Sequence, residues 1–338
     1  MKSYVTPDLK GDICTVFDKY LSAPLVTEEI HRNKASRNFW IVAKGHNPWS
    51  VAGQSAHQIA EKWSEEKDYH EVEGRPGEFT LRRKNNSLNL LSETKIFIPS
   101  NNDPLEIMLV KVANEGKTPV EFKAAYSIPV YGRSADNFRD HRQVTSMFQK
   151  TRIMDSGISV KPSIKHDESG HRVNTTEYSV FAFDQEGNSA RDQWALMEDF
   201  IGEGGSLLNP EALALDLPSP EYDDNNINGK EAIAAFRWDK KELAPGESEI
   251  FVMLHCITES ESETLELYEK YKDFKNLTHS LSETRQYWEI FTNHIEIHTA
   301  YNEFDNWVKW IIYQVKCRQI FGNSYLPDFG YGRGGRGW

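Results

Sequence analysis

The sequence has no long hydrophobic run, few cysteines and no excess of positive charge, and each absence excludes a class of protein. No apolar run approaches the ~18 residues of a membrane-spanning helix. The formal net charge of −12 disfavours nucleic acid and anionic membranes as partners. Residues 1–8 lack the apolar core of a secretory signal peptide. We therefore expect a cytoplasmic protein that binds neither nucleic acid nor a membrane.

The three cysteines, Cys14, Cys256 and Cys317, are odd in number and lie far apart in the sequence. Their spacing does not match a zinc site or a disulfide framework. We expect three reduced thiols, as is usual in the cytosol. The sequence accordingly predicts no metal site and no cofactor.

The middle of the chain has the patterns of β-strands. Residues 105–112 are nearly continuous in apolar side chains, as in a strand covered on both faces. Residues 120–130 place apolar side chains at every second position, and a turn-forming segment at 114–119 lies between the two. We expect this pair to form a long hairpin, with further strands at residues 178–183, 232–238 and 250–255. Many strands, and few helical patterns before residue 260, predict a mainly β fold with a large antiparallel β-sandwich.

The pattern becomes helical after Thr258. One helix is expected to contain Leu267, Tyr271 and Phe274, and a second to contain Leu277, Leu281, Thr284, Trp288 and Phe291. A third helix follows Tyr301, with apolar residues on two faces: Phe304, Trp307, Val308, Ile311 and Val315, and then Trp310, Tyr313 and Cys317. Such a helix usually packs between layers, so we expect another polypeptide to cover Trp307, Trp310, Ile311 and Ile312.

These patterns divide the chain into four parts. Residues 1–40 are expected to be an N-terminal extension that packs on the next unit, residues 41–258 the β-sandwich, and residues 259–299 a helical linker. Residues 300–338 begin a further domain whose remainder we expect outside this sequence. Their last segment, from Asn323 to Trp338, is rich in glycine and arginine, which is typical of a loop whose backbone approaches a ligand. An RNA-binding tail is disfavoured, because two arginines stand on a strongly acidic protein.

Three other polar groups have residue types found in binding or catalytic sites. His294 and His298 are four residues apart, but Ile295 and Ile297 alternate with polar residues, so an extended segment or turn is expected, and no carboxylate or cysteine completes a metal site. The glycine-rich residues 202–206 lack the lysine of a phosphate-binding loop, which favours a turn. The nearby carboxylates Glu198, Asp199 and Glu203 are expected to be solvated.

A loop from Tyr131 to Arg142 leaves the predicted sandwich and is rich in polar residues. Loops on a rigid scaffold often carry binding contacts. A plain solvated connection is an equally good interpretation. The sequence contains no G-x-S-x-G nucleophile signature.

Four groups of segments resemble the amino-terminal part of the inverting glycoside phosphorylases of glycoside hydrolase family 94, the cellobiose and chitobiose phosphorylase group. In chain order they are Asn47–Ser50 with Glu93–Pro99 and Asp103–Ile107; Phe200–Gly202 with Ser206–Leu213; Leu243–Glu247; and Tyr313–Arg318 with Ser324–Tyr325 and Gly332–Trp338. The last group is the most specific. The resemblance covers residues 40–338.

This resemblance implies a β-sandwich, a helical linker and the first helix of an (α/α)6 catalytic barrel. It implies phosphorolysis of a β-glucoside, a cellobiose-like disaccharide or a β-glucan, with inorganic phosphate as co-substrate and inversion at the anomeric carbon. Arg333 matches a sugar-binding arginine, and Arg336 and Trp338 belong to the same expected substrate-binding loop. The general acid is expected beyond Trp338, so the chain alone should be inactive. Asn323 stands where the family often has arginine, which leaves the sugar preference open.

The family also implies a homodimer, in which the loop from Tyr131 to Arg142 covers a neighbour's active site. The other partner expected is the remainder of the barrel, as another segment or chain. Two alternatives stay open: a non-catalytic β-sandwich that binds carbohydrate or acts as a scaffold, and an inverting glycoside hydrolase on the same architecture.

Overall fold

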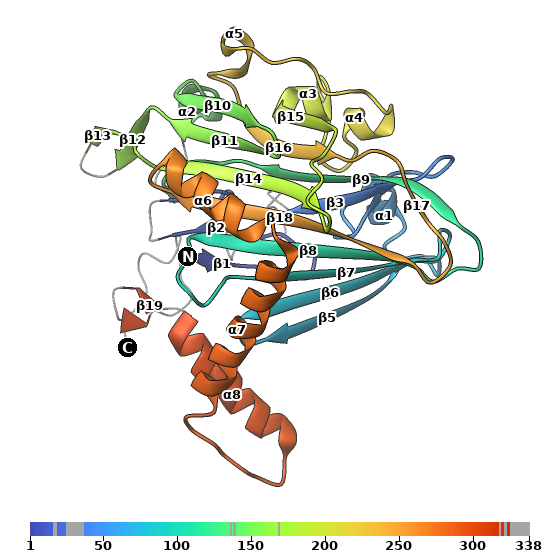
Figure 1. Cartoon of the computed structure of the whole chain (residues 1–338), viewed down its shortest axis with the longest axis vertical. Coiled ribbons are helices and arrows are strands. Elements are labelled where there is room, and N and C mark those ends of the chain that lie inside the picture. Colours follow the sequence, from blue (N-terminus) through green and yellow to red (C-terminus); the bar gives the residue numbers. More distant parts are fainter. Residues whose placement is uncertain are drawn as a thin grey trace.

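The computed structural model describes residues 1–15, 19–24, 37–135, 137, 140–167, 170–317, 319–320 and 323–324. Two large antiparallel sheets dominate this part of the chain (Figure 1). They pack face to face as a sandwich, and the helices lie on its outer faces and beyond one end. The predicted mainly β fold with a large antiparallel sandwich is confirmed.

The first sheet has eight strands and contains most of the long ones. Their order is β10 (Gln149–Met154), β11 (Gly157–Pro162), β14 (Glu177–Asp184), β18 (Ser248–Thr258), β8 (Leu105–Asn114), β7 (Leu90–Phe97), β6 (Glu78–Asn85) and β5 (Tyr69–Arg75). The strands predicted at residues 105–112, 178–183 and 250–255 are the three central ones.

The second sheet has six strands. Its order is β15 (Asp192–Leu196), β16 (Ala232–Arg237), β9 (Val120–Pro129), β3 (Asn38–Val42) and β4 (Trp49–Ser50), with β17 (Lys241–Leu243) also paired to β9. Short pairs are formed by β1 (Lys2–Ser3) with β2 (Ile13–Cys14), β12 (Ile164–Asp167) with β13 (Gly170–Val173), and β19 (Gln319–Ile320) with β20 (Asn323–Ser324).

The helices fall into two groups. The short ones are α1 (Ala56–Ala60), α2 (Arg142–Ser146), α3 (Met197–Ile201), α4 (Glu211–Ala214) and α5 (Asp224–Ile227). The long ones are α6 (Glu261–Tyr271), α7 (Phe274–Thr292) and α8 (Asn302–Cys317). Among the described helices, none combines the length and apolar content that crossing a bilayer requires.

The apolar side chains form three stacked layers. The main core lies between the sheets and contains inward residues of both, such as Met108 and Val110 from β8 and Phe236 from β16. A second cluster joins the outer face of the eight-stranded sheet to α6 and α7, and a third joins the outer face of the six-stranded sheet to α3 and α4. Burial of both faces explains why β8 is nearly continuous in apolar residues.

The predicted hairpin between residues 105–112 and 120–130 is wrong. The two segments are β8 and β9, but β8 pairs with β7 and β18, and β9 pairs with β3 and β16. The turn at residues 115–119 instead carries the chain from one sheet to the other. A hairpin and a crossover between sheets share the same local signature, and only the strands that occupy the two edges of β8 decide between them.

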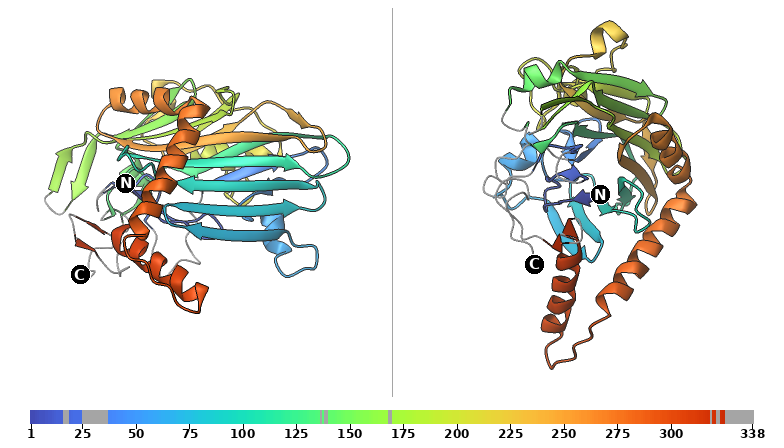
Figure 2. Two further views of the ribbon diagram at one scale, coloured as in Figure 1. Left: turned by 60° about the horizontal axis from the view of Figure 1, so that its bottom comes forward. Right: turned by 90° about the vertical axis from the view of Figure 1, so that its left-hand side faces the viewer.

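The helical region begins where the sequence pattern indicated. Ser260 caps α6 by accepting a hydrogen bond from the Glu263 amide, and Asp273 caps α7 by accepting one from the Lys275 amide. Phe274 is the first residue of α7 and not, as predicted, part of the preceding helix, because the cap at Asp273 starts a new helix. Helix α7 crosses the strands of the eight-stranded sheet, and α8 returns beside it (Figure 2).

The described part of the N-terminal segment lies against the sandwich. Leu9, Ile13 and Leu21 are fully buried in the core between the sheets. Tyr20 pairs through its backbone with both Cys14 and Arg133. These contacts join the segment to the beginning of the Tyr131–Arg142 loop.

Candidate functional site

The predicted substrate-binding residues Arg333, Arg336 and Trp338 lie outside the described residues. Their roles stay predictions. The described segment nearest to them in sequence is α8 with the short β19 and β20.

The turn between β5 and β6 supports α7 and α8. Glu78, at the start of β6, accepts two hydrogen bonds from Arg285 of α7, with N–O distances of 2.6 and 2.8 Å. The Glu78 side chain is buried, and this contact raises the pKa of Arg285. A bidentate arginine–carboxylate pair fixes orientation as well as distance.

An aromatic contact continues this support to α8. Trp288 of α7 and Tyr313 of α8 meet edge to face with ring centroids 4.7 Å apart. Gly77 lies directly beneath Trp288, with φ of +78°, and a Cβ there would lie 2.0 Å from Trp288 Cδ1. Only glycine permits both this backbone conformation and this close approach. Burial raises the pKa of Tyr313 to about 12.

The opposite side of α8 is open. No described side chain of α8 is buried in this structure. The exposed apolar residues on this side are Phe304, Trp307, Ile311 and Val315, with Trp307 exposed by 56%. We call this set the α8 apolar face. Trp310 lies on the supported side, where its ring centroid is 5.1 Å from that of Tyr313. The prediction that another polypeptide covers the α8 apolar face stays a prediction.

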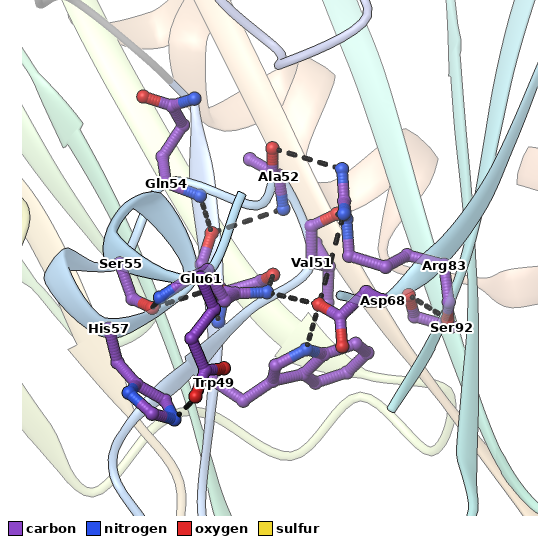
Figure 3. Close-up of polar contacts among 12 residues, drawn as sticks. Trp49, Val51, Ala52, Gln54, Ser55, His57, Glu61, Asp68, Arg83 and Ser92 are labelled. Carbon is purple, nitrogen blue, oxygen red and sulfur yellow. Dashed lines mark hydrogen bonds and ion pairs between the residues drawn. The ribbon is translucent and has the colours of Figure 1, made fainter. Parts of the chain in front are cut away.

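A polar cluster forms around Asp68 at the segment that contains the Asn47–Ser50 motif (Figure 3). Asp68 accepts hydrogen bonds from Trp49 Nε1 at 2.8 Å and from Gln58 Nε2 at 2.5 Å. Arg83 Nη1 lies 3.8 Å from the same carboxylate, and Arg83 Nε donates to the Val51 carbonyl at 3.0 Å. Burial lowers the pKa of Arg83, and the nearby Asp68 opposes this effect.

Ser50 fixes the turn that follows β4. Its hydroxyl donates to Asn38 Oδ1 at 2.6 Å and accepts from the amides of Ala52 and Gln54. Gln58 also accepts from the Ser50 amide and donates to the Ser50 carbonyl. The side chains of this Asp68 cluster bond one another and the backbone, so the cluster is a framework that holds α1 and the following turn.

A second polar network lies inside the sandwich. Arg37 donates to both carboxylate oxygens of Glu106 at 2.7 and 2.8 Å. His255 Nδ1 lies 2.9 Å from Glu106 Oε1, and Tyr126 OH lies 2.6 Å from His255 Nε2. Ser3 also donates to Glu106. Tyr126 belongs to the six-stranded sheet and the other two strand residues to the eight-stranded one, so this network crosses the core.

The electrostatics of this network follow from its complete burial. Burial alone would raise the pKa of Glu106, but Arg37 and His255 outweigh it and hold the value at about 2. Burial lowers the pKa of His255, and Glu106 opposes that shift only in part. The ionised Glu106–Arg37 pair therefore holds a neutral His255. Since the side chains of Arg37, Glu106 and His255 have no solvent exposure, the network stabilises the fold and does not contact substrate.

Sequence reasoning missed both clusters. The sequence does contain a signal for the Glu106 network, because Glu106 interrupts an otherwise apolar stretch at a position that shares a face with Met108 and Val110. A charge at such a position requires a buried partner. The signal for Asp68 is weak, because that residue lies in a segment rich in charged side chains.

The other predicted segments are placed as follows. Residues 202–206 form a turn after α3, and the carboxylates Glu198, Asp199 and Glu203 are exposed; both expectations are confirmed. His294 Nδ1 contacts the Ile290 carbonyl, whereas His298 lies 3.5 Å from Glu296. No group of possible metal ligands occurs among the described residues.

The three cysteines, all within the described residues, form no disulfide. Burial raises the thiol pKa values of Cys14 and Cys256. The Tyr131–Arg142 loop begins inside the fold, where Tyr131 and Arg133 are buried and Arg133 donates to Ser146 Oγ. Its predicted role at a neighbour's active site stays a prediction.

Comparisons with known proteins give one family. A family model described as glycosyl hydrolase 94, supersandwich domain, matches residues 27–274. Among curated proteins, none matches the sequence. Similar solved structures include a bacterial glucoamylase in complex with acarbose, with 10% identity, a TM-score of 0.46, and coverage of 85% of this chain and 36% of that one.

Two further solved structures are a polysaccharide lyase and a galactose mutarotase related enzyme from Lactobacillus acidophilus. The lyase is 14% identical with a TM-score of 0.36, and the match covers 72% of this chain and 28% of the lyase. The mutarotase relative is 10% identical with a TM-score of 0.35, and covers 77% and 98%, respectively. The chain thus spans about a third of the length of the glucoamylase and less of the lyase.

The family match includes strands β3 to β18 and ends at Phe274, where α7 begins. It therefore includes every strand of both large sheets, the turn that supports α7 and α8, and α6. The chain belongs to the glycosyl hydrolase 94 supersandwich-domain family, a family of carbohydrate-active enzymes.

Proposed function

We propose that this chain is the N-terminal portion of an inverting β-glucoside phosphorylase, in which inorganic phosphate cleaves a cellobiose-like disaccharide or a β-glucan to give a sugar 1-phosphate. The observation that carries the proposal is the supersandwich family match over residues 27–274. The resemblance of residues 332–338 to the sugar-binding loop of the phosphorylases adds the reaction type. Phosphate is the co-substrate, and no cofactor takes part.

The α8 apolar face supports the second part of the proposal, that α8 is the first helix of an (α/α)6 barrel. Burying a large apolar side chain contributes about 1.5–3 kcal/mol, and this face exposes four of them. The support from Glu78, Gly77 and Trp288 holds α8 in place without covering that face. Further barrel helices, as another segment or another chain, are the proposed cover.

The proposed barrel helices would supply the general acid and the phosphate-binding groups that the reaction needs. Inverting cleavage needs one carboxylic acid to protonate the leaving oxygen, while phosphate attacks from the opposite side in place of water. A guanidinium such as that of Arg333 can bind sugar hydroxyls with several fixed hydrogen bonds. Glu198, Asp199 and Glu203 are exposed and are not proposed as this acid; the proposed general acid lies beyond Trp338.

The test is a phosphate-dependence assay on the complete gene product, with cellobiose and cellodextrins as substrates. We expect α-glucose 1-phosphate to form only when phosphate is present, and the anomeric configuration is read by proton NMR. The 338-residue chain alone should show no turnover. Glucose release that is independent of phosphate would identify a hydrolase and refute the proposed reaction. An independent check is the coding sequence beyond Trp338: the resemblance to the phosphorylases implies a sugar-binding Arg-Asp pair directly after this position, followed by a helical barrel.

A further inference from the structure

The turn between α1 and β5 presents a tryptophan to solvent. Trp63 is 87% exposed, more than any other large apolar side chain of the described residues. We propose that Trp63 is the stacking platform of a surface site for a neutral β-linked gluco-oligosaccharide. The choice of glucan rests on the proposed function, whereas the presence of a stacking site rests on the geometry of this turn.

The backbone that carries Trp63 is held at both ends. On the N-terminal side, Ser55 caps α1 by accepting from the Gln58 amide, and the Ala56 amide donates to the Leu208 carbonyl at 2.8 Å. On the C-terminal side, Asp68 is fixed by Trp49 and Gln58 in the Asp68 cluster (Figure 3). Between them, the Ser64 amide donates to the Glu61 carbonyl at 2.9 Å.

This anchoring matters because binding costs conformational entropy. A tryptophan has only two side-chain torsions, and here its backbone is already ordered, so a ligand that stacks on the ring immobilises little. In a free protein, an ordered and almost fully exposed indole leaves most of its apolar surface in water, and Lys62 over the ring contributes one contact with it. Both points favour a preformed contact site.

The chemistry around the ring favours a sugar. The apolar C–H face of a β-glucopyranose matches the flat face of an indole, while its equatorial hydroxyls point outward to polar neighbours. Lys62 Nζ lies over one face of the Trp63 ring, 5.3 Å from its centre, so the sugar is assigned to the other face. Glu65, Glu66 and Lys67 are exposed in the same turn. These side chains can donate to and accept from hydroxyl groups at the edge of a stacked sugar.

The charge of the turn excludes the main alternatives. From Glu61 to Asp68 the sequence carries four carboxylates and two lysines, a net charge of −2. That charge repels acidic polysaccharides, nucleic acid and anionic lipid. A protein partner is also disfavoured, because lysine and glutamate are depleted from interface cores, and here they flank the only tryptophan of the turn.

The experiment is a titration of the 338-residue chain with cellohexaose, without phosphate, followed by the indole N–H signals in NMR and by calorimetry. We expect one indole signal to shift with saturation and to disappear in the Trp63→Ala variant. We expect Trp63→Ala to weaken binding by about tenfold or more, as for loss of one aromatic stack. Trp307→Ala, which removes an exposed tryptophan from α8, is the matched control and should bind as the wild type does.

Three other results would refute the proposed sugar site. Failure of cellohexaose to bind at about 10 mM, or equal binding by the wild type and Trp63→Ala, removes the platform. Self-association that Trp63→Ala abolishes would assign the indole to a contact with a second copy. Because the titration needs no turnover, a negative phosphorolysis assay refutes the proposed reaction and leaves the binding result standing.

Discussion

Replacing Glu106 by glutamine should destabilise the sandwich more than neutralising any exposed carboxylate would. Glutamine keeps the shape of the side chain but leaves Arg37, which has no solvent exposure, without its counter-charge. Removing one partner of a buried ion pair costs about 3–5 kcal/mol. The pKa gives a second route to this figure: a shift from the ordinary value of 4.5 to about 2 corresponds to about 3 kcal/mol. The two values agree.

The pH dependence follows from the same shifts. Glu106 has a lowered pKa in the folded state, so its contribution is present above about pH 4.5 and is lost as the pH falls toward 2. The pKa of His255 is also lowered in the folded state, so this histidine is protonated first in the unfolded chain. Stability therefore falls as the pH drops below about 6.5. We therefore expect stability to decline in two stages on acidification, and the difference between wild type and Glu106→Gln to shrink below about pH 4.5.

The assay is urea unfolding followed by tryptophan fluorescence at pH 7 and at lower pH. Glu115→Gln is the control, because its pair with Lys84 lies 2.8 Å apart but exposes more than a third of each side chain; its loss should stay below about 1 kcal/mol. The double variant Arg37→Met/Glu106→Leu should be more stable than Glu106→Gln, since it leaves no buried charge unpaired. A loss for Glu106→Gln no larger than that of the control would refute this reasoning.

Two further predictions concern the helices. Gly77→Ala should destabilise the chain by about 1–3 kcal/mol and speed amide exchange in α7 and α8, because the added Cβ collides with Trp288 and the backbone is left-handed. Gly246→Ala is the control for backbone strain alone, since Gly246 has φ of +82° and open space around it. Equal losses of stability in the two variants would contradict the collision. Trp307→Ser should change the unfolding free energy of this chain by less than about 0.5 kcal/mol, measured by denaturant titration, and should reduce its aggregation, measured by light scattering. In the complete enzyme the same substitution should lower the unfolding free energy several times more. An equal loss in both proteins would argue against a cover on α8.

Much of the architecture could be predicted from local patterns. The central strands β8, β14 and β18 and the helices α7 and α8 carry apolar periodicities that need no partner to be recognised. The family resemblance through the Asn47–Ser50 and Leu243–Glu247 segments agrees with the family match. The terminal site residues Arg333, Arg336 and Trp338 rest on that resemblance alone.

Local patterns specify which segments become strands or helices, because alternation and three-to-four spacing are properties of the chain. They do not specify which strands pair: β8 and β9 are separated by a turn, yet they lie in different sheets, because β7 and β18 occupy both edges of β8. Only the tertiary structure brought Arg37, Glu106 and His255 together, and only it showed Gly77 beneath Trp288. These contacts join residues far apart in the chain, and their energy depends on burial, which no local pattern contains.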